Sequence, residues 1–255
     1  MTEVIYIIFF FVFGIAFGSF FDVVATRLPK NESIVRPRSF CTHCKKTLKW
    51  YELIPLVSYV IQFGKCRNCH EKIPFSSFIM ELVTGILFAV SYHVFGLSLE
   101  LVIALIFISA LVITIISDIE YMIILDEVLL ISTILITIVK LFDVGLLETG
   151  KSLLFASASF VTMYLIKLFG DVVFKKESLG GGDIKLMFLF GLVLGYPLAI
   201  CSILLGTFIA FPLALIVLIT KKDNMIPFGP FLSVAAIILL ISKINLNDII
   251  NFIIS

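Results

Sequence analysis

The sequence predicts an all-α integral membrane protein with about eight transmembrane helices and one sizeable polar loop. Of its 255 residues, 60% are hydrophobic and only 15% are charged, whereas about a quarter of the residues in soluble domains are charged. The mean hydropathy is +1.16. The 26 phenylalanines and the long isoleucine and leucine runs exclude a disordered or collagen-like chain. A net charge of +1 gives no field that would favour nucleic acid, so the lipid bilayer is the expected partner.

Apolar stretches separated by charges and turn residues are the candidates for these spans. A bilayer core of about 30 Å requires roughly 20 apolar helical residues, although tilted or buried spans differ in length. The expected spans are residues 4–25, 78–95, 100–117, 127–142, 152–169, 184–195, 198–219 and 228–242. The first has no basic segment before it and no small-residue cleavage pattern after it, so we expect it to be retained.

Lysine and arginine are unevenly distributed between the two sides of these spans. With the N-terminus outside, the inner segments hold 15 of these residues, ten of them in the first loop, and the outer segments hold 3. The positive-inside rule therefore places the first loop in the cytoplasm and the spans in the cell membrane. The expected organisation is a first helix (1–25), a cytoplasmic loop (26–77) and a transmembrane bundle (78–255).

Two CxxC pairs lie in the cytoplasmic loop, separated by 21 residues. They are Cys41-Thr-His-Cys44 and Cys66-Arg-Asn-Cys69. Two turns of this kind supply four thiolates, which complete a tetrahedral site for Zn²⁺. Disulfides or a redox pair are the alternatives, but the cytoplasm keeps thiols reduced. We therefore expect a closed, structural zinc site.

Other residues of this loop leave a second arrangement open. His43 or His70 in place of one thiolate would give an open, catalytic zinc site. Residues 48–60, between the pairs, are too apolar for a free loop and are expected to pack the zinc module against the membrane face. Cys201, alone in the seventh span, is expected to be a small core residue.

Acidic residues in or beside a span are costly and are functional candidates. Asp118 ends the third span, and Asp183 follows Gly180, Gly181 and Gly182 at the start of the sixth. The predicted topology brings both aspartates to the same cytoplasmic depth, although 65 positions separate them. Two carboxyl groups that meet in a partly dry site do not both ionise easily, and such a pair can activate water for peptide hydrolysis.

Simpler interpretations and other functions remain open at this point. Asp183 can cap a helix, and Asp118 can be a solvated helix end. Asp22 and Glu81 lie inside apolar runs and are expected to form polar pairs within the bundle. The chain could then be an ion transporter that uses Asp22 or Glu81, or a non-catalytic platform whose zinc loop recruits secretion partners.

Ordered motifs run along nearly the whole chain. Besides the two CxxC pairs, they are the segments 17–20, 27–29, 50–59, 64–67, 81–85, 180–186 and 226–231. In this order they resemble the type IV prepilin peptidases, the membrane-bound leader peptidases of pilus, type II secretion and competence systems.

The resemblance implies an aspartic endopeptidase of the GxGD type in the bacterial inner membrane. It would remove the leader peptide of prepilins or pseudopilins on the cytoplasmic side. Its catalytic residues would be Asp118 and Asp183, supported by the backbone of 180–182. The zinc ligands of the family correspond to Cys41, Cys44, Cys66 and Cys69.

A second activity is also implied by the resemblance. Many members methylate the new N-terminus with S-adenosylmethionine, and the glycine tied to that activity corresponds to Gly64. The chain departs from the family in having Leu125 where proline is usual and Asp22 where asparagine is usual. Neither departure removes a carboxyl group from the expected catalytic pair.

Overall fold

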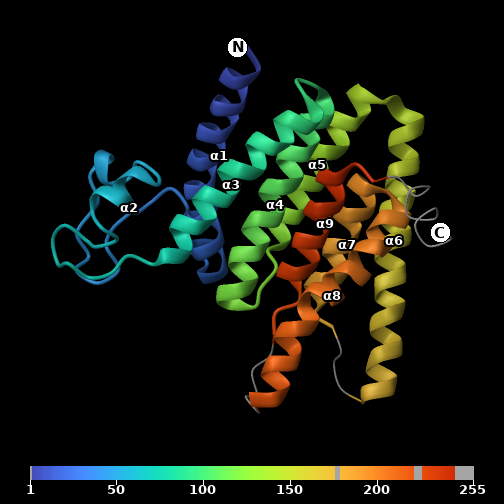
Figure 1. Ribbon diagram of the computed structural model, residues 1–255. Coiled ribbons are helices and arrows are strands. Elements are labelled where there is room, and N and C mark those ends of the chain that lie inside the picture. The colour runs from blue at the N-terminus through green and yellow to red at the C-terminus, as the bar shows by residue number, and fades with distance from the viewer. Residues whose placement is uncertain (1, 176–178, 221–225, 245–255) are drawn as a thin grey trace. The chain divides into compact units, whose positions relative to one another are not determined.

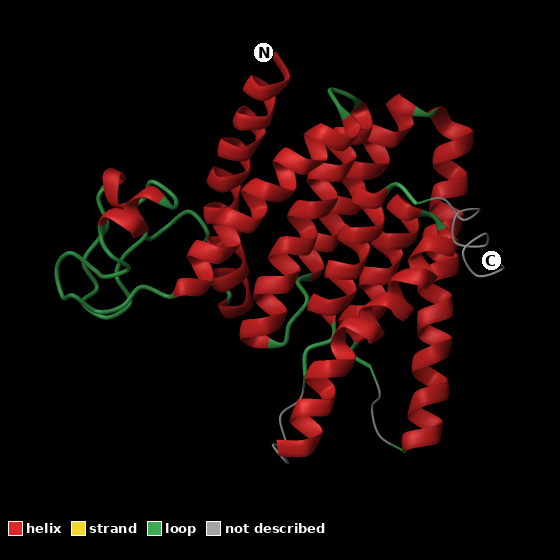
Figure 2. Cartoon of the chain, viewed as in Figure 1, coloured by secondary structure: helices red, strands yellow, loops and turns green. Residues whose placement is uncertain are grey.

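The computed structural model describes residues 2–175, 179–220 and 226–244 (Figures 1 and 2). Lys176, Lys221 and Lys222, which contribute to the predicted charge asymmetry, lie outside these ranges. Within them the structure is largely helical and has no strand, which confirms the all-α prediction. The chain divides into two compact units, Met1–Leu97 and Ser98–Ser255.

The first unit consists of two long helices and the loop that joins them, which we call the Cys loop (residues 28–74). Its helices are α1 (Thr2–Arg27), η1 (Leu28–Lys30), η2 (Trp50–Glu52), α2 (Val57–Ile61) and α3 (Phe75–Phe95). α1 and α3 pack closely (Figure 1) because glycines remove side chains from their contact. A Cβ atom on Gly14 would lie 2.7 Å from the carbonyl oxygen of Thr84, and one on Gly18 would lie 2.9 Å from Glu81 Cα. Small residues four apart allow this approach in membrane helices.

The second unit is a bundle built around a short buried helix. Its helices are α4 (Leu99–Tyr121), α5 (Asp126–Asp143), α6 (Gly145–Phe174), α7 (Gly181–Leu194), α8 (Tyr196–Thr220) and α9 (Gly229–Ser242). α7 contacts each of the other five helices. Its apolar side chains are buried almost all round, and the Phe190 ring meets the Phe107 ring of α4 edge-on at a centroid distance of 5.8 Å. This burial fixes the first turn of α7 against its neighbours.

Five of the eight predicted spans are long and apolar enough to cross a membrane. They are α1, α3, α4, α6 and α8. The other three predicted spans form helices as well, but α7 and α9 have only 14 residues each and α5 carries charges at both ends. These five long apolar helices identify the chain as a membrane protein. That α5, α7 and α9 also cross the bilayer stays a prediction.

Candidate active site and metal centre

Asp118 lies in the last turn of α4. Met122 ends this helix in the left-handed conformation, and its N–H donates to the Asp118 carbonyl oxygen at 3.0 Å. Asp118 is only 6% exposed, and the backbone N–H of Gly229 is hydrogen-bonded to its carboxyl group. A backbone donor from the start of α9 therefore orients a buried carboxyl group at the end of α4.

Asp183 lies in the first turn of α7, which begins directly after Gly180 as its N-cap. Asp183 is only 7% exposed, and its carboxyl group is hydrogen-bonded to the backbone of Gly180. A carboxylate in the first turn of a helix is also stabilised by the helix dipole. The glycine-rich turn thus presents a second buried carboxyl group.

Both aspartates line one cavity of about 460 Å³ in the second unit. The rest of the lining comes from three segments: Met122 and Ile124 after α4, residues 179–182 at the start of α7, and residues 226–228 before α9. The carboxyl groups of Asp118 and Asp183 are close enough to interact electrostatically. The structure therefore brings together the two acidic residues that the predicted topology placed at one depth.

Two glycines allow these turns to close around Ile124. A Cβ atom on Gly182 would lie 2.7 Å from Ile124 Cβ, and one on Gly229 would lie 2.6 Å from Asp118 Oδ2. A Cβ atom on Gly181, by contrast, would meet nothing within 4 Å. Within the predicted supporting run 180–182, Gly182 is thus the position where the absence of a side chain is required for packing.

The remaining acidic residues near the cavity are at the surface. Glu120 and Glu127 are exposed. Asp126 forms an ion pair with Lys185 at 2.6 Å, and both of these side chains are at least half exposed. Such an exposed pair contributes about 0–1 kcal/mol. It joins the start of α5 to α7 and leaves the two buried carboxyl groups as the chemically distinctive ones.

The two CxxC pairs adopt the same local structure. In each, the N–H of the first cysteine, Cys41 or Cys66, donates to the carbonyl oxygen five residues later. The N–H four residues after that cysteine, of Lys45 or His70, donates back to its carbonyl oxygen, and both of these residues have positive φ. Because the two turns have the same geometry, each presents its pair of sulfur atoms in the same way.

The four sulfur atoms of Cys41, Cys44, Cys66 and Cys69 lie within 4.8 Å of one another. The Sγ–Sγ distance is 3.8 Å between Cys41 and Cys69 and 4.0 Å between Cys44 and Cys66. Tetrahedral Zn–S bonds of about 2.3 Å place two sulfurs about 3.8 Å apart. All four cysteines are free thiols, so the disulfide alternative is not what the structure contains. The cluster can hold a metal ion.

Electrostatics within the cluster also favour a bound cation. The backbone N–H groups of Cys69 and Asn68 lower the pKa of the Cys66 thiol to about 6. The N–H of Glu71 acts in the same direction on Cys69, but burial and the neighbouring thiols outweigh it and raise the pKa of Cys69 to about 12. One thiolate therefore opposes the ionisation of another, and a divalent cation among the sulfurs would remove that repulsion.

Gly64 begins the turn that carries the second CxxC pair. Its φ is +65°, in the left-handed region, and a Cβ atom there would lie 2.7 Å from the Tyr59 hydroxyl oxygen. Its N–H donates to Tyr59 O at 2.9 Å, and its carbonyl oxygen accepts from the Ile73 N–H at 2.8 Å. These two hydrogen bonds and the left-handed φ show that Gly64 holds the turn in place.

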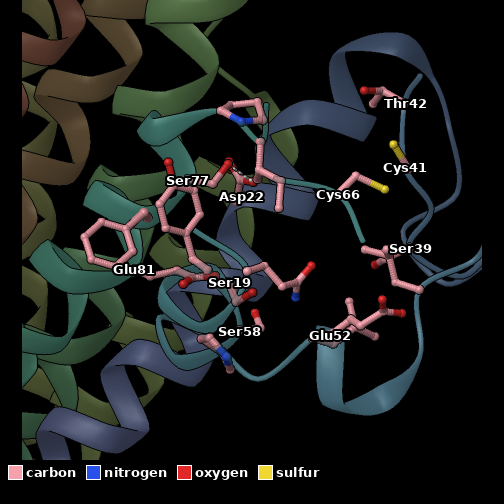
Figure 3. Close-up of a pocket in the computed structure, with 18 of the residues that line it drawn as sticks. Ser19, Asp22, Ser39, Cys41, Thr42, Glu52, Ser58, Cys66, Ser77 and Glu81 are labelled. Atoms are coloured by element: carbon pink, nitrogen blue, oxygen red, sulfur yellow. Dashed lines mark hydrogen bonds between the residues drawn. The ribbon is translucent and has the colours of Figure 1, made fainter. Parts of the chain in front are cut away.

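Asp22 and Glu81 line a second cavity, of about 250 Å³, within the first unit (Figure 3). Ser77 Oγ donates to Asp22 Oδ2 at 3.0 Å, and the Leu56 N–H donates to Glu81 Oε2 at 2.8 Å. Both acids therefore have polar partners, but these lie in the first unit and its loop and not within the helix bundle of the second unit. The Glu81 bond also ties the Cys loop to α3.

Two residues contribute to this site without a sign of it in the sequence: Ile124, which lines the acidic cavity, and Gly229, whose N–H binds the Asp118 carboxyl group. The prolines on either side of the Phe228-Gly229 pair do mark a turn. They do not indicate that this turn meets the end of α4, because the contact is made by a backbone N–H. The motif 226–231 marks this turn in the sequence, but the sequence alone assigns no catalytic or binding role to it.

Comparison with known proteins gives two family matches and several related proteins. Residues 12–95 match the family described as Bacterial Peptidase A24 N-terminal domain, and residues 105–217 match the Type IV leader peptidase family. A Bacillus subtilis (strain 168) protein named prepilin leader peptidase/N-methyltransferase is 35% identical over 89% of this chain and 91% of its own length.

Relatives of the same name occur in other bacteria. That of Myxococcus xanthus (strain DK1622) is 36% identical over 73% of this chain and 56% of its own length. That of Vibrio cholerae is 29% identical over 94% of this chain and 98% of its own length. No solved structure matches the chain. From the family match over the second unit and the near full-length relatives, the chain belongs to the type IV leader peptidase family.

Proposed function

We propose that this chain is an aspartic endopeptidase that removes the leader peptide of prepilins or pseudopilins, with Asp118 and Asp183 as its catalytic pair. One observation supports this most directly: two buried carboxyl groups from the ends of α4 and α7 line a single cavity. The substrate class follows from the names of the relatives, which are prepilin leader peptidases.

The proposed chemistry uses the two carboxyl groups as one acid–base pair. Two carboxyl groups in one buried site share a proton, because their charges repel and burial disfavours both. The ionised group takes a proton from water as the water attacks the scissile carbonyl carbon, and the protonated group donates to the carbonyl oxygen. A proton then passes to the leaving amide nitrogen as the C–N bond breaks. Because such a pair titrates as a unit, acid and base are roles of the pair.

The walls of the cavity support this assignment. Met122, Ile124 and Phe228 line it beside the two aspartates, so the site combines apolar surface with two polar groups. A prepilin has a basic leader before an apolar helix, and an unwound scissile bond would reach the carboxyl groups from that helix. Apolar walls keep bulk water from solvating the carboxyl groups and strengthen the interaction between them.

We propose that the N-terminus is outside and that the Cys loop and the acidic cavity face the cytoplasm at the bacterial inner membrane. The excess of Lys and Arg in the inner segments, 15 against 3, supports this orientation. In this proposal residues 1–25 anchor the chain, 26–77 form the zinc loop and 78–255 form the peptidase bundle.

We propose Zn²⁺ as a structural ion of the Cys loop. The donor set supports zinc, because four thiolates at tetrahedral spacing form a closed site without a position for water. Held by Cys41, Cys44, Cys66 and Cys69, the ion would join the two similar turns into one module. Neither His43 nor His70 belongs to the sulfur cluster.

N-methylation of the new N-terminus with S-adenosylmethionine is proposed from the names of the relatives. In this chain Gly64 shapes the second CxxC turn, because its N–H and carbonyl oxygen are bonded within the turn and Tyr59 fills the space beside it. We assign Gly64 no direct part in methyl transfer. A substitution there would act by distorting the second CxxC turn.

Cleavage and methylation can be tested together. The purified chain in detergent is incubated with a prepilin, with and without S-adenosylmethionine, and the products are identified by mass spectrometry. We expect Asp118→Asn and Asp183→Asn to lower cleavage at least about 10²-fold, while the exposed Glu120→Gln cleaves as the unaltered chain does. Undiminished cleavage by Asp183→Asn would contradict the catalytic pair, and absence of cleavage by the unaltered chain would support the assembly platform.

A further inference from the structure

Four of the exposed apolar side chains of the Cys loop lie in or just after α2, although this loop carries nine of the nineteen Lys and Arg residues. They are Val57, Val60, Ile61 and Phe63, and we call them the α2 patch. The exposed fractions of Val60, Ile61 and Phe63 are 61%, 59% and 88%. A group of exposed apolar side chains next to one another marks a contact with protein or lipid.

Two contacts fix α2 beside the first two turns of α3. The Leu56 N–H, directly before α2, donates to Glu81 Oε2 at 2.8 Å. The Tyr59 ring lies 4.9 Å from the Phe78 ring and 6.2 Å from the Phe75 ring, measured between centroids. The level of α2 along α3 is therefore set between Phe75 and Glu81.

An α3 that crosses the bilayer from end to end would place this level at the edge of the bilayer. α3 has 21 residues and is one of the helices able to cross a membrane. At about 1.5 Å per residue it is about 31 Å long, which matches a hydrocarbon core of about 30 Å. In that placement no turn of α3 is left over to extend into water, so a segment beside its first two turns would lie in the interfacial region.

A groove with basic side chains adjoins the α2 patch. Its volume is about 460 Å³, and it is lined by Ile61, Phe63, Lys65, Arg67 and His70, together with Gln62 and Cys66. Lys65 and Arg67 are exposed. Apolar groups beside cationic ones match an anionic phospholipid, whose acyl chains are apolar and whose phosphate is negative.

We propose that the α2 patch is inserted in the membrane interface and that the adjoining groove binds the head group of an anionic phospholipid. Phe75 and Ile79 are also exposed on the first turns of α3, beside which α2 lies, and the charge of the groove complements the phosphate. This contact holds the Cys loop against the bilayer. It does not depend on the peptidase activity.

The single tryptophan of the chain makes the depth of the patch measurable. In a Trp50→Phe background, Phe63→Trp places the only indole on the patch, and His43→Trp places it in the exposed turn of the first CxxC pair as a matched control. Both proteins are reconstituted in phosphatidylcholine vesicles with brominated acyl chains. Because both sites are exposed, the substitutions remove no core contact, and bound zinc is measured to verify that the loop is folded.

We expect the bromolipid to quench the Phe63→Trp fluorescence strongly and that of His43→Trp weakly, with aqueous acrylamide giving the opposite order. Equal accessibility of both probes to acrylamide, without quenching by lipid, would overturn insertion of the patch. It would leave a protein partner as the occupant of this surface.

The head-group site has its own test. Adding phosphatidylglycerol to the vesicles should increase quenching of the Phe63→Trp probe, and Lys65→Gln should remove that increase. Arg38→Gln, which removes the same charge from an exposed position outside the groove, should retain it. Loss of the increase in both variants, or no increase at all, would overturn a specific site for an anionic lipid.

Discussion

Individual glycines determine whether the two carboxyl groups can occupy one cavity. Gly229 leaves room for the Asp118 carboxyl group and also donates its backbone N–H to it. Gly182 leaves room for Ile124, which lies between the turns that lead into α7 and α9. A side chain at either position would displace a carboxyl group or the loop beside it.

Gly229→Ala should lower kcat for leader removal by about 10²-fold, because a displacement of about 1 Å in a catalytic group has an effect of that size. The added Cβ would lie 2.6 Å from Asp118 Oδ2 and must move it. Gly150→Ala in α6 is the matched control, since a Cβ atom there meets nothing within 4 Å. Steady-state cleavage rates decide the outcome, and wild-type kcat in Gly229→Ala would contradict this role.

The acidic and sulfur side chains of the candidate site and the glycine run 180–182 were predictable from the sequence, whereas the contribution of Gly229 was not. Asp118 and Asp183 could be identified because an acidic residue at the end of an apolar run is unusual and the topology gives its depth. The four cysteines could be identified because their spacing limits how they bind an ion. The role of Gly229 could not be predicted, because every residue except proline has a backbone N–H. The residue type therefore does not show which N–H binds the carboxyl group.

Among the helices, the close packing of α1 on α3 depends on small residues. Gly14 and Gly18 of α1 and Gly85 of α3 are all positions where a Cβ atom would come within 2.9 Å of the partner helix. In lipid, where the hydrophobic effect does not drive helices together, such close van der Waals contact is a main source of stability.

Gly14→Ile should destabilise the first unit by about 1–3 kcal/mol, the usual range for overpacking. Ala16→Ile adds the same side chain to an exposed position of α1 and should change stability by less than about 0.5 kcal/mol. Thermal unfolding of both variants in detergent measures the difference. Equal melting temperatures would show that α1 and α3 do not depend on this contact.

The sequence predicted which segments form the long helices, but it did not predict where these helices begin and end. Each predicted span corresponds to a helix because its apolar run has no charge cluster within it, and α8 continues through Pro212. The span expected at 152–169 is a 30-residue helix, Gly145–Phe174, because Glu148 and Lys151 continue it as an exposed ion pair at 2.6 Å. α2 was not predicted as a helix, since five residues are too few for a periodic pattern.

At the scale of the whole molecule, the metal module and the acidic cavity belong to different compact units. The two family matches follow the same division, with residues 12–95 in the first unit and 105–217 in the second. The metal is therefore expected to stabilise the first unit without contributing to the folding of the second.

Removing the metal with a chelator should make the Cys loop sensitive to protease while the helices of the second unit stay protected. Without an ion, the two CxxC turns are joined by few other contacts, such as Lys46 Nζ to Asn68 Oδ1 at 3.3 Å. Limited proteolysis with mass spectrometry locates the cuts, and metal analysis should give one zinc per chain. Cys201→Ser, outside the cluster, should keep its zinc, and cuts confined to the second unit would contradict this picture.

The pairing of Asp118 with Asp183 is tested most directly by a double-substitution cycle. The measurement is the rate of leader removal by Asp118→Asn, by Asp183→Asn and by the double variant, with Asp126→Asn as an exposed acidic control. If the two carboxyl groups act as one unit, each single change lowers the rate at least about 10²-fold and the second change adds little. Independent, multiplying losses, or substantial cleavage by either single variant, would contradict a shared catalytic site.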